Sequence, residues 1–96
     1  MNIIEKKWND ILDQIRKEHE LSAVSFNTWL KPLTVYSYEN HTVRILVPLQ
    51  RVGLDYISKK FMLPLKVAVT EVTGEECIIQ FILPEDAKRE EEQKST

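Results

Sequence analysis

The side chains that could do chemistry in this chain are few, and none has the spacing of a common catalytic or metal site. His19, His41 and Cys77 lie too far apart in the sequence to form a compact metal-binding motif. The two glycines, Gly53 and Gly74, stand alone, so they form no glycine-rich phosphate-binding loop. No serine lies in a nucleophile elbow, and no pair of carboxylates stands in an apolar context. We therefore expect no enzyme activity, no cofactor and no metal site, which leaves a binding module.

Basic side chains that could contact nucleic acid gather at Lys59, Lys60 and Lys66. Phosphate backbones are bound mainly by Lys and Arg, so this strip is the candidate for nucleic-acid contact. Residues 1–84, however, carry ten acidic and ten basic side chains, and the net charge of −2 comes from residues 85–96, with five acids and three bases. A neutral domain argues against strong non-specific binding to nucleic acid, and a solvated helix face is the other interpretation of the lysines.

The two tryptophans are the side chains best suited to a protein partner. Trp8 shares an apolar helical stripe with Ile4, and such a stripe normally faces the core. An exposed Trp8 beside Ile4 would instead be a strong association site. Trp29 lies in the stretch "SFNTWLKPL" at 25–33, where its ring can be half buried with Thr28 beside it. Both interpretations of Trp8, core and interface, stay open at this point.

The apolar spacing predicts the elements that position these residues. We expect helices at about 2–19, 23–30 and 50–73, and strands at 34–39, 42–47 and 77–82. Ser22 is the expected cap of the second helix and Pro32 stops it, with Phe26, Leu30 and Leu33 directed to the core. Pro64 should break or kink the third helix near 61–64.

These elements predict an α+β fold of order ααββαβ, a two-layer domain with a three-stranded sheet and an interrupted third helix. The domain should span residues 1–84. Residues 85–96 are dense in charge and lack apolar periodicity, so they should be a disordered tail or the start of a linker.

Cys77 is the single cysteine, so no intramolecular disulfide is expected and a reducing compartment is favoured. The chain starts without a charged segment followed by an apolar one, and its apolar runs are too short to cross a bilayer. We expect a cytoplasmic protein without a membrane partner.

Several segments together resemble the N-terminal domain of DnaA, the bacterial replication initiator. They are Trp8 with its amphipathic helix, "LSAVSFNTWLKPL", two strands ending in "VP", "DYISKKF" and "EVTGEECIIQFI". The resemblance covers about residues 4–83. It implies a KH-like α+β domain, without the ATPase and sequence-specific DNA-binding parts. It also implies weak self-association, recruitment of the replicative helicase, binding of initiation regulators and weak contact with single-stranded DNA.

The resemblance also assigns roles to single residues. Trp8 matches the family tryptophan tied to self-association, with Ile4 beside it, and Thr28 and Trp29 match positions used for partner proteins. Ser25, also a candidate contact residue, stands where some members carry a glutamate linked to helicase contact, so the resemblance does not carry that particular contact over.

The largest departure from the family pattern follows Pro48. The family often has "PNxF" there, with an exposed phenylalanine as an anchor. This chain continues instead with four residues that we predict to contact a partner, Leu49, Gln50, Arg51 and Val52. Val52 stands where the phenylalanine would be, and a smaller anchor implies a different partner or weaker binding. The chain also lacks the GxxG loop with which KH domains clamp RNA.

Two hypotheses therefore stand. The first is a protein-interaction domain of a replication initiator, and the alternative is a weak single-stranded nucleic-acid-binding module that uses the sheet or the three lysines. The salt dependence of binding would separate them, because phosphate contacts weaken steeply with salt.

Overall fold

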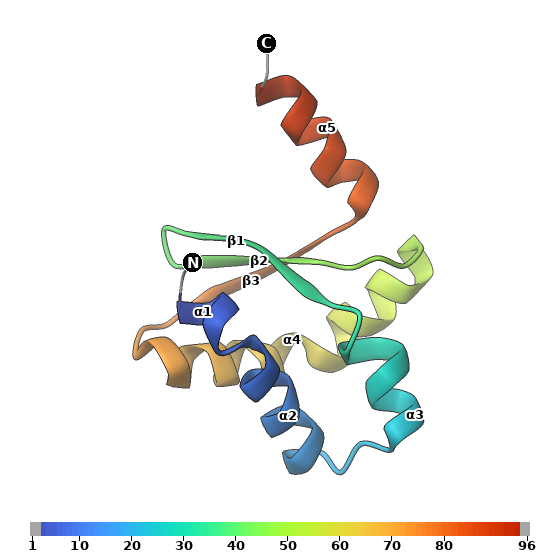
Figure 1. Ribbon diagram of the computed structural model, residues 1–96, viewed down its shortest axis with the longest axis vertical. Helices are drawn as coiled ribbons and strands as arrows, with labels where there is room; N and C mark the ends of the chain where they lie inside the picture. Colours follow the sequence, from blue (N-terminus) through green and yellow to red (C-terminus); the bar gives the residue numbers. More distant parts are fainter. Residues whose placement is uncertain (1–2, 95–96) are drawn as a thin grey trace.

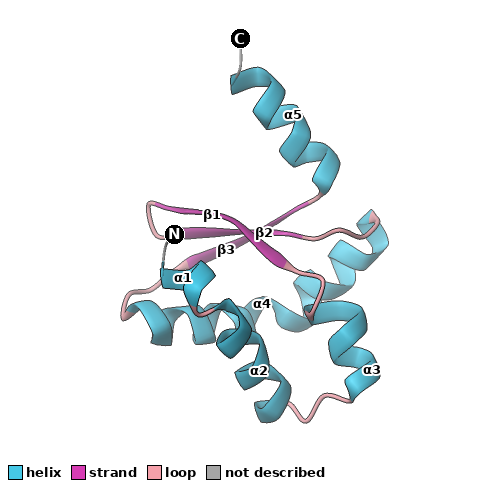
Figure 2. Ribbon diagram, viewed as in Figure 1, coloured by secondary structure: helices cyan, strands magenta, loops and turns pink. Residues whose placement is uncertain are grey.

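The computed structural model describes residues 3–94, in which three strands form one sheet with helices on both sides. The elements are α1 (Ile3–Lys6), α2 (Trp8–Glu18), α3 (Ala23–Ser25), the π-helix η1 (Phe26–Leu30), β1 (Thr34–Glu39), β2 (Thr42–Leu46), α4 (Arg51–Thr73), β3 (Ile78–Ile82) and α5 (Pro84–Lys94). Figure 1 shows α1 to α4 on one side of the sheet and α5 rising from the other. The colouring by secondary structure in Figure 2 makes the two layers, helices and sheet, plain. The predicted α+β class is confirmed.

The sheet has the order β1-β2-β3 and is mixed. β1 and β2 pair antiparallel, and β2 and β3 pair parallel because α4 carries the chain across. Asn40 and His41 make the turn between the first two strands, both with positive φ, of 50° and 62°. The register shifts between Val35 and Ser37, which leaves Tyr36 in a β-bulge.

The core lies between the sheet and helices α1, α2 and α4. Side chains of β2 alternate, and Val43, Ile45 and Val47 point inward with no exposed surface. The apolar stripe of α2 and the buried face of α4 meet them. Leu30 and Leu33 are buried as predicted, whereas Phe26 is only half buried against this core.

The first two predicted helices differ from the structure in detail. The helix predicted at 2–19 is divided by a turn at Lys7, and residue 2 lies outside the described residues. Ser22 caps the second helix, since its Oγ accepts the Ser25 N–H at 3.1 Å. That helix then widens into a π-turn, in which the N–H of Lys31 donates to the carbonyl of Phe26 at 2.9 Å.

Of the predicted break or kink near 61–64, the structure has the kink, because α4 is one helix with Pro64 inside it. Its ribbon changes direction near the middle (Figure 1), as a proline that lacks an N–H and crowds the preceding turn requires. Gly74 ends the helix with φ of 75°, the expected left-handed cap.

Most of the segment 85–96, predicted as a disordered tail or the start of a linker, is helical, because residues Pro84–Lys94 form α5. The helix begins with acids in its first turn, which suits the helix dipole. Leu83 and Ala87 are 3% and 6% exposed, so the start of α5 is anchored by burial. The remainder of the predicted tail, 95–96, lies outside the described residues. Within residues 3–94, no helix has the length and apolar character needed to cross a membrane.

Candidate partner-binding surface

An aromatic pair joins the second helical hairpin to the start of α4. The rings of Trp29 and Tyr56 lie 4.4 Å apart between centroids and are tilted by 39°. Trp29 is half buried, as predicted, and Tyr56 is 38% exposed. Val52 precedes Tyr56 by one helical turn and is 79% exposed, and Thr28 is exposed beside Trp29. We call Thr28, Trp29, Val52 and Tyr56 the aromatic surface.

The turn before α4 sets the position of Val52. Gln50 is the N-cap residue in an extended conformation, and its carbonyl accepts the Leu54 N–H at 3.1 Å. Leu49 is half buried and lies directly over Gly53, where a Cβ would come within 2.9 Å of the Leu49 Cβ. Of the four predicted contact residues at 49–52, Leu49 therefore packs inward, whereas Gln50, Arg51 and Val52 are exposed.

Sequence reasoning missed Tyr56 and Val24. Tyr56 follows Val52 at i+4, so a helix that starts at residue 51 places both on one face. Val24 is 75% exposed on α3, next to the predicted contact residue Ser25. Ser25 is itself half buried, and its backbone N–H is held by the Ser22 cap. An apolar residue in the first turn of a short capped helix was the available signal for Val24.

The predicted basic strip is divided in the structure. Lys60 donates to the hydroxyl of Tyr56 at 3.0 Å and lies 5.5 Å from the centre of that ring. Lys66 pairs with Glu76 at 3.4 Å, which neutralises it locally. Lys59 is exposed on the same helix. The three lysines thus do not act as one uninterrupted run of positive charge.

Of the two interpretations left open for Trp8 and Ile4, core and interface, the structure favours the core. Ile4 has no exposed surface, and Trp8 is 8% exposed. The indole N–H of Trp8 donates to the carbonyl of Leu33 at 2.8 Å, a buried hydrogen bond that joins α2 to the start of β1. The accessible edge of Trp8 lines a hollow of about 500 Å³ together with Phe26 and Leu33. The apolar stripe of the first helices is therefore a core stripe.

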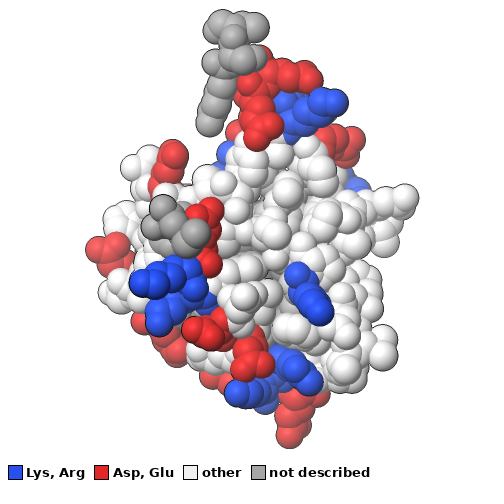
Figure 3. All heavy atoms as spheres, viewed as in Figure 1, with Lys and Arg blue, Asp and Glu red and all other residues white. Residues whose placement is uncertain are grey.

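Charge and polarity favour a protein over a small charged ligand at the aromatic surface. Figure 3 shows few charged side chains over α3 and the first turns of α4, whereas they gather over α5 and around α1 and α2. Among residues 3–94, no cluster of three or more His, Cys, Asp or Glu side chains is placed to hold a metal ion. Half-exposed aromatic rings in a weakly charged setting are typical of protein interfaces.

Comparison with known proteins gives three findings. Residues 5–71 match the family described as "DnaA N-terminal domain". The chromosomal replication initiator protein DnaA of Lachnoclostridium phytofermentans is 36% identical over 93 residues, covering 94% of this chain but 20% of that protein. The chain thus spans about a fifth of the length of this relative.

The third finding concerns the fold. A crystal structure of a HobA-DnaA (domain I-II) complex from Helicobacter pylori superposes with a TM-score of 0.58 at 18% identity, covering 84% of this chain and 99% of the other. At that identity the likeness establishes the fold alone. The family match covers most of the chain, and the relative agrees with it over nearly the whole length. This chain therefore belongs to the DnaA N-terminal domain family.

Proposed function

We propose that the chain is an interaction domain of a bacterial replication initiator, which recruits the replicative helicase, binds initiation regulators and associates with itself in the cytoplasm. Its family is that of a non-catalytic interaction domain. The observation that carries the proposal is the aromatic surface, where the Trp29–Tyr56 pair stands beside two exposed neighbours, Thr28 next to Trp29 in the chain and Val52 one turn before Tyr56. A few side chains of this kind can supply most of a binding energy.

The class of partner follows from the solved relative. The Helicobacter pylori protein was solved in complex with HobA, so a domain of this fold does bind another protein. By analogy, we propose that a replication regulator or the helicase occupies the aromatic surface here. Val52 offers less apolar area than a phenylalanine, which favours a weaker contact or a partner with a shallower pocket.

Self-association remains part of the proposal, with a changed location. Since Ile4 and Trp8 are buried, a homodimer would use exposed neighbours such as Ile3, which is 43% exposed on α1. A loss of dimer on mutation of Trp8 would then report a damaged core rather than a lost contact.

Nucleic-acid binding has less support. Lys66 is paired with Glu76, and Lys60 lies against Tyr56. The sheet face away from the core carries the acidic helix α5 (Figure 1). Phosphate binding needs several free cations in one place.

The test is calorimetric binding of the purified replicative helicase from the source bacterium to the Thr28→Ala and Val52→Ala variants. We expect each to weaken binding by about fivefold to tenfold, roughly 1 kcal/mol, without a change in melting temperature. Val67→Ala is the matched control, because Val67 is 45% exposed at the far end of the same helix. Unchanged affinity in both folded variants would exclude the aromatic surface as the helicase site.

A further inference from the structure

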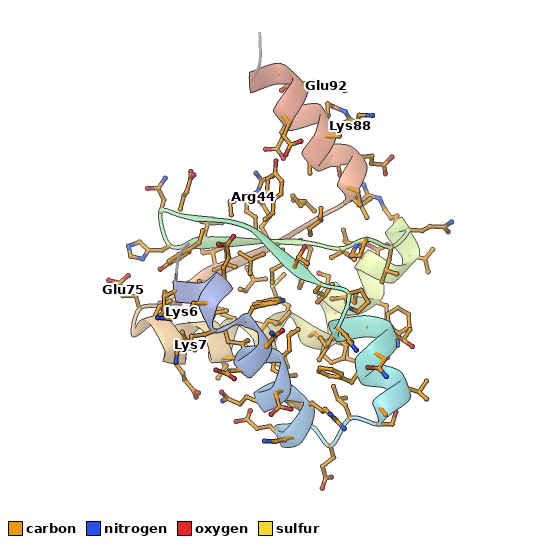
Figure 4. All side chains as sticks on the ribbon, viewed as in Figure 1. Lys6, Lys7, Arg44, Glu75, Lys88 and Glu92 are labelled. Carbon is orange, nitrogen blue, oxygen red and sulfur yellow. The ribbon has the colours of Figure 1, made fainter. Side chains whose placement is uncertain are left out.

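Arg44 is held in one orientation on the face of the sheet that points away from the core. Its Nε donates to the Gln80 side chain at 2.8 Å, and its guanidinium lies 5.5 Å from the centre of the Tyr36 ring. Figure 4 shows Arg44 extending from β2 toward α5. Both terminal nitrogens bond to the carboxylate of Glu90, with the first contact at 2.8 Å. This bidentate contact is the geometry with which arginine recognises a carboxylate.

The same face offers an apolar contact next to the arginine. Ile82 follows Ile79 by three positions, so it points to the opposite face, away from the core. It is nevertheless only 6% exposed, as is Ala87 on α5, so the first turns of the helix cover this end of the sheet. One turn further on, the Tyr36 hydroxyl donates to Glu91 at 3.3 Å. We call Tyr36, Arg44, Gln80 and Ile82 the outer-face site.

α5 packs against the rest of the domain with fewer buried side chains than α2 or α4. Of its side chains described by the structure, only Ala87 is buried. The Arg44 and Glu90 side chains keep 22% and 36% of their surface exposed. The ribbon projects away from the body of the domain (Figure 1). A helix held by one small apolar residue and a few partly exposed polar contacts opens more readily than one packed in a core.

We propose that the outer-face site is a docking surface for an acidic helix and that α5 occupies it in cis as an inhibitory strap. When α5 leaves, Arg44 stays oriented by Gln80, and Ile82 becomes accessible beside it. A partner helix that presents a carboxylate to Arg44 then repeats the contact that Glu90 makes, and a small apolar residue one turn before that carboxylate takes the place of Ala87.

The partner is an acidic protein segment rather than nucleic acid because the site holds one cation. Tyr36, Gln80 and Ile82 are uncharged. The pKa of Arg44 is raised mainly by Glu90 and more weakly by Glu39, so a second acid also lies near the guanidinium. A phosphate backbone gains its affinity from several Lys and Arg contacts. One oriented guanidinium beside an apolar side chain matches a carboxylate on an amphipathic helix.

The test uses the whole chain and a fluorescent peptide of residues 83–94 as the probe. In the intact chain the tethered α5 competes with the peptide, and only the open fraction binds it. The Glu90→Gln/Glu91→Gln double variant weakens the strap, so we expect it to bind the peptide about tenfold more tightly than the unmodified chain. Glu85→Gln is the control, since it removes a carboxylate from an exposed position of α5, one against the two of the double variant, and should leave the affinity unchanged.

Adding Arg44→Gln to the double variant should abolish the gain, and amide NMR signals of the core should stay in place in every variant. Equal peptide affinity in the double variant and the unmodified chain would overturn the strap. Tight binding that survives Arg44→Gln would overturn the site. A gain in affinity for a single-stranded oligonucleotide without a gain for the peptide would overturn the choice of partner.

Discussion

Trp8 shows at the scale of a single residue how a side chain suited to an interface is used in the core. Its ring is buried with Ile4, and its only polar atom is satisfied by the Leu33 carbonyl. A buried donor or acceptor that loses its partner carries the full cost of its desolvation. The indole therefore contributes both apolar burial and a hydrogen bond that fixes where β1 begins.

The variants of Trp8 should separate these two contributions. Trp8→Ala should lower the free energy of unfolding by about 3–5 kcal/mol, because it leaves a large cavity. Trp8→Phe keeps most of the ring but leaves the Leu33 carbonyl unpaired, so it should cost about 1–3 kcal/mol. Urea unfolding followed by circular dichroism measures both. A melting curve unchanged by Trp8→Ala, with a weaker dimer in sedimentation, would contradict the core assignment.

Two tyrosines make the stability sensitive to alkaline pH. Burial first, and then Glu91, raises the pKa of Tyr36, and burial first, and then a hydrogen bond with Cys77, raises the pKa of Tyr38. Each tyrosine has a higher pKa in the folded state than in the unfolded state. Its contribution to the free energy of unfolding is complete below the unfolded pKa, about pH 10, and is lost as the pH rises through the folded pKa. The free energy of unfolding should therefore fall above pH 10 or so.

Ultraviolet titration of tyrosinate checks this expectation. In the Tyr36→Phe and Tyr38→Phe variants the late-titrating part of the absorbance change should shrink, and the alkaline fall in stability should become shallower. Variants that keep the full alkaline transition would show that other groups cause it.

At the scale of the elements, the first turn of α4 and the π-turn η1 together build the aromatic surface. Both depend on local backbone choices: the extended Gln50 that starts α4 and the wide turn that ends at Lys31. The close approach of Leu49 to Gly53 joins the preceding loop to the helix. The position of Val52 therefore depends on Gly53, which leaves room for Leu49 in the preceding loop.

Gly53→Ala tests that dependence. Alanine in a helix is favoured over glycine by about 1 kcal/mol, but its Cβ would stand 2.9 Å from the Leu49 Cβ and must displace Leu49. We expect no gain in melting temperature and faster hydrogen exchange at the Leu54 amide, which bonds to Gln50. Gly74→Ala serves as a comparison, since it meets no atom within 4 Å but is strained by its φ of 75°. A clear stabilisation by Gly53→Ala would show that Leu49 moves aside freely.

At the scale of the whole molecule, the domain has one main core, and α5 is an appendage to it. The core cluster draws on α1, α2, η1, α4 and the sheet, and it does not include Ala87. The residues before α5 thus supply most of the apolar burial that offsets the entropy lost on folding.

Ending the chain after Leu83 should therefore leave the fold intact. We expect a loss of only about 1–2 kcal/mol in the free energy of unfolding, because a helix whose release tightens peptide binding about tenfold contributes about 1.4 kcal/mol by docking. Denaturant unfolding should show nearly the same dependence on denaturant concentration, since the surface exposed on unfolding hardly changes. Loss of the cooperative transition in the shortened chain would make α5 part of the core domain.

The sequence by itself determined the features that depend on neighbouring residues. The Ser22 cap, the turn at Asn40 and His41 and the Gly74 helix end were all predictable, because each is a backbone preference of the residues at that position. The alternation of Val43 and Ile45 likewise predicted a strand with one buried face. The family resemblance likewise rested on short sequence segments that follow one another in a fixed order.

The tertiary structure alone decided which side chains meet across the fold. Trp8 is buried because Leu33, 25 residues away, supplies its hydrogen-bond partner. Tyr56 meets Trp29 because the fold brings the first turns of α4 against η1. The charged tail becomes a docked helix because Arg44, 46 residues before Glu90, meets it on the outer face of the sheet. Local sequence sets the conformation of a segment, whereas burial and pairing depend on segments that only the folded chain brings together.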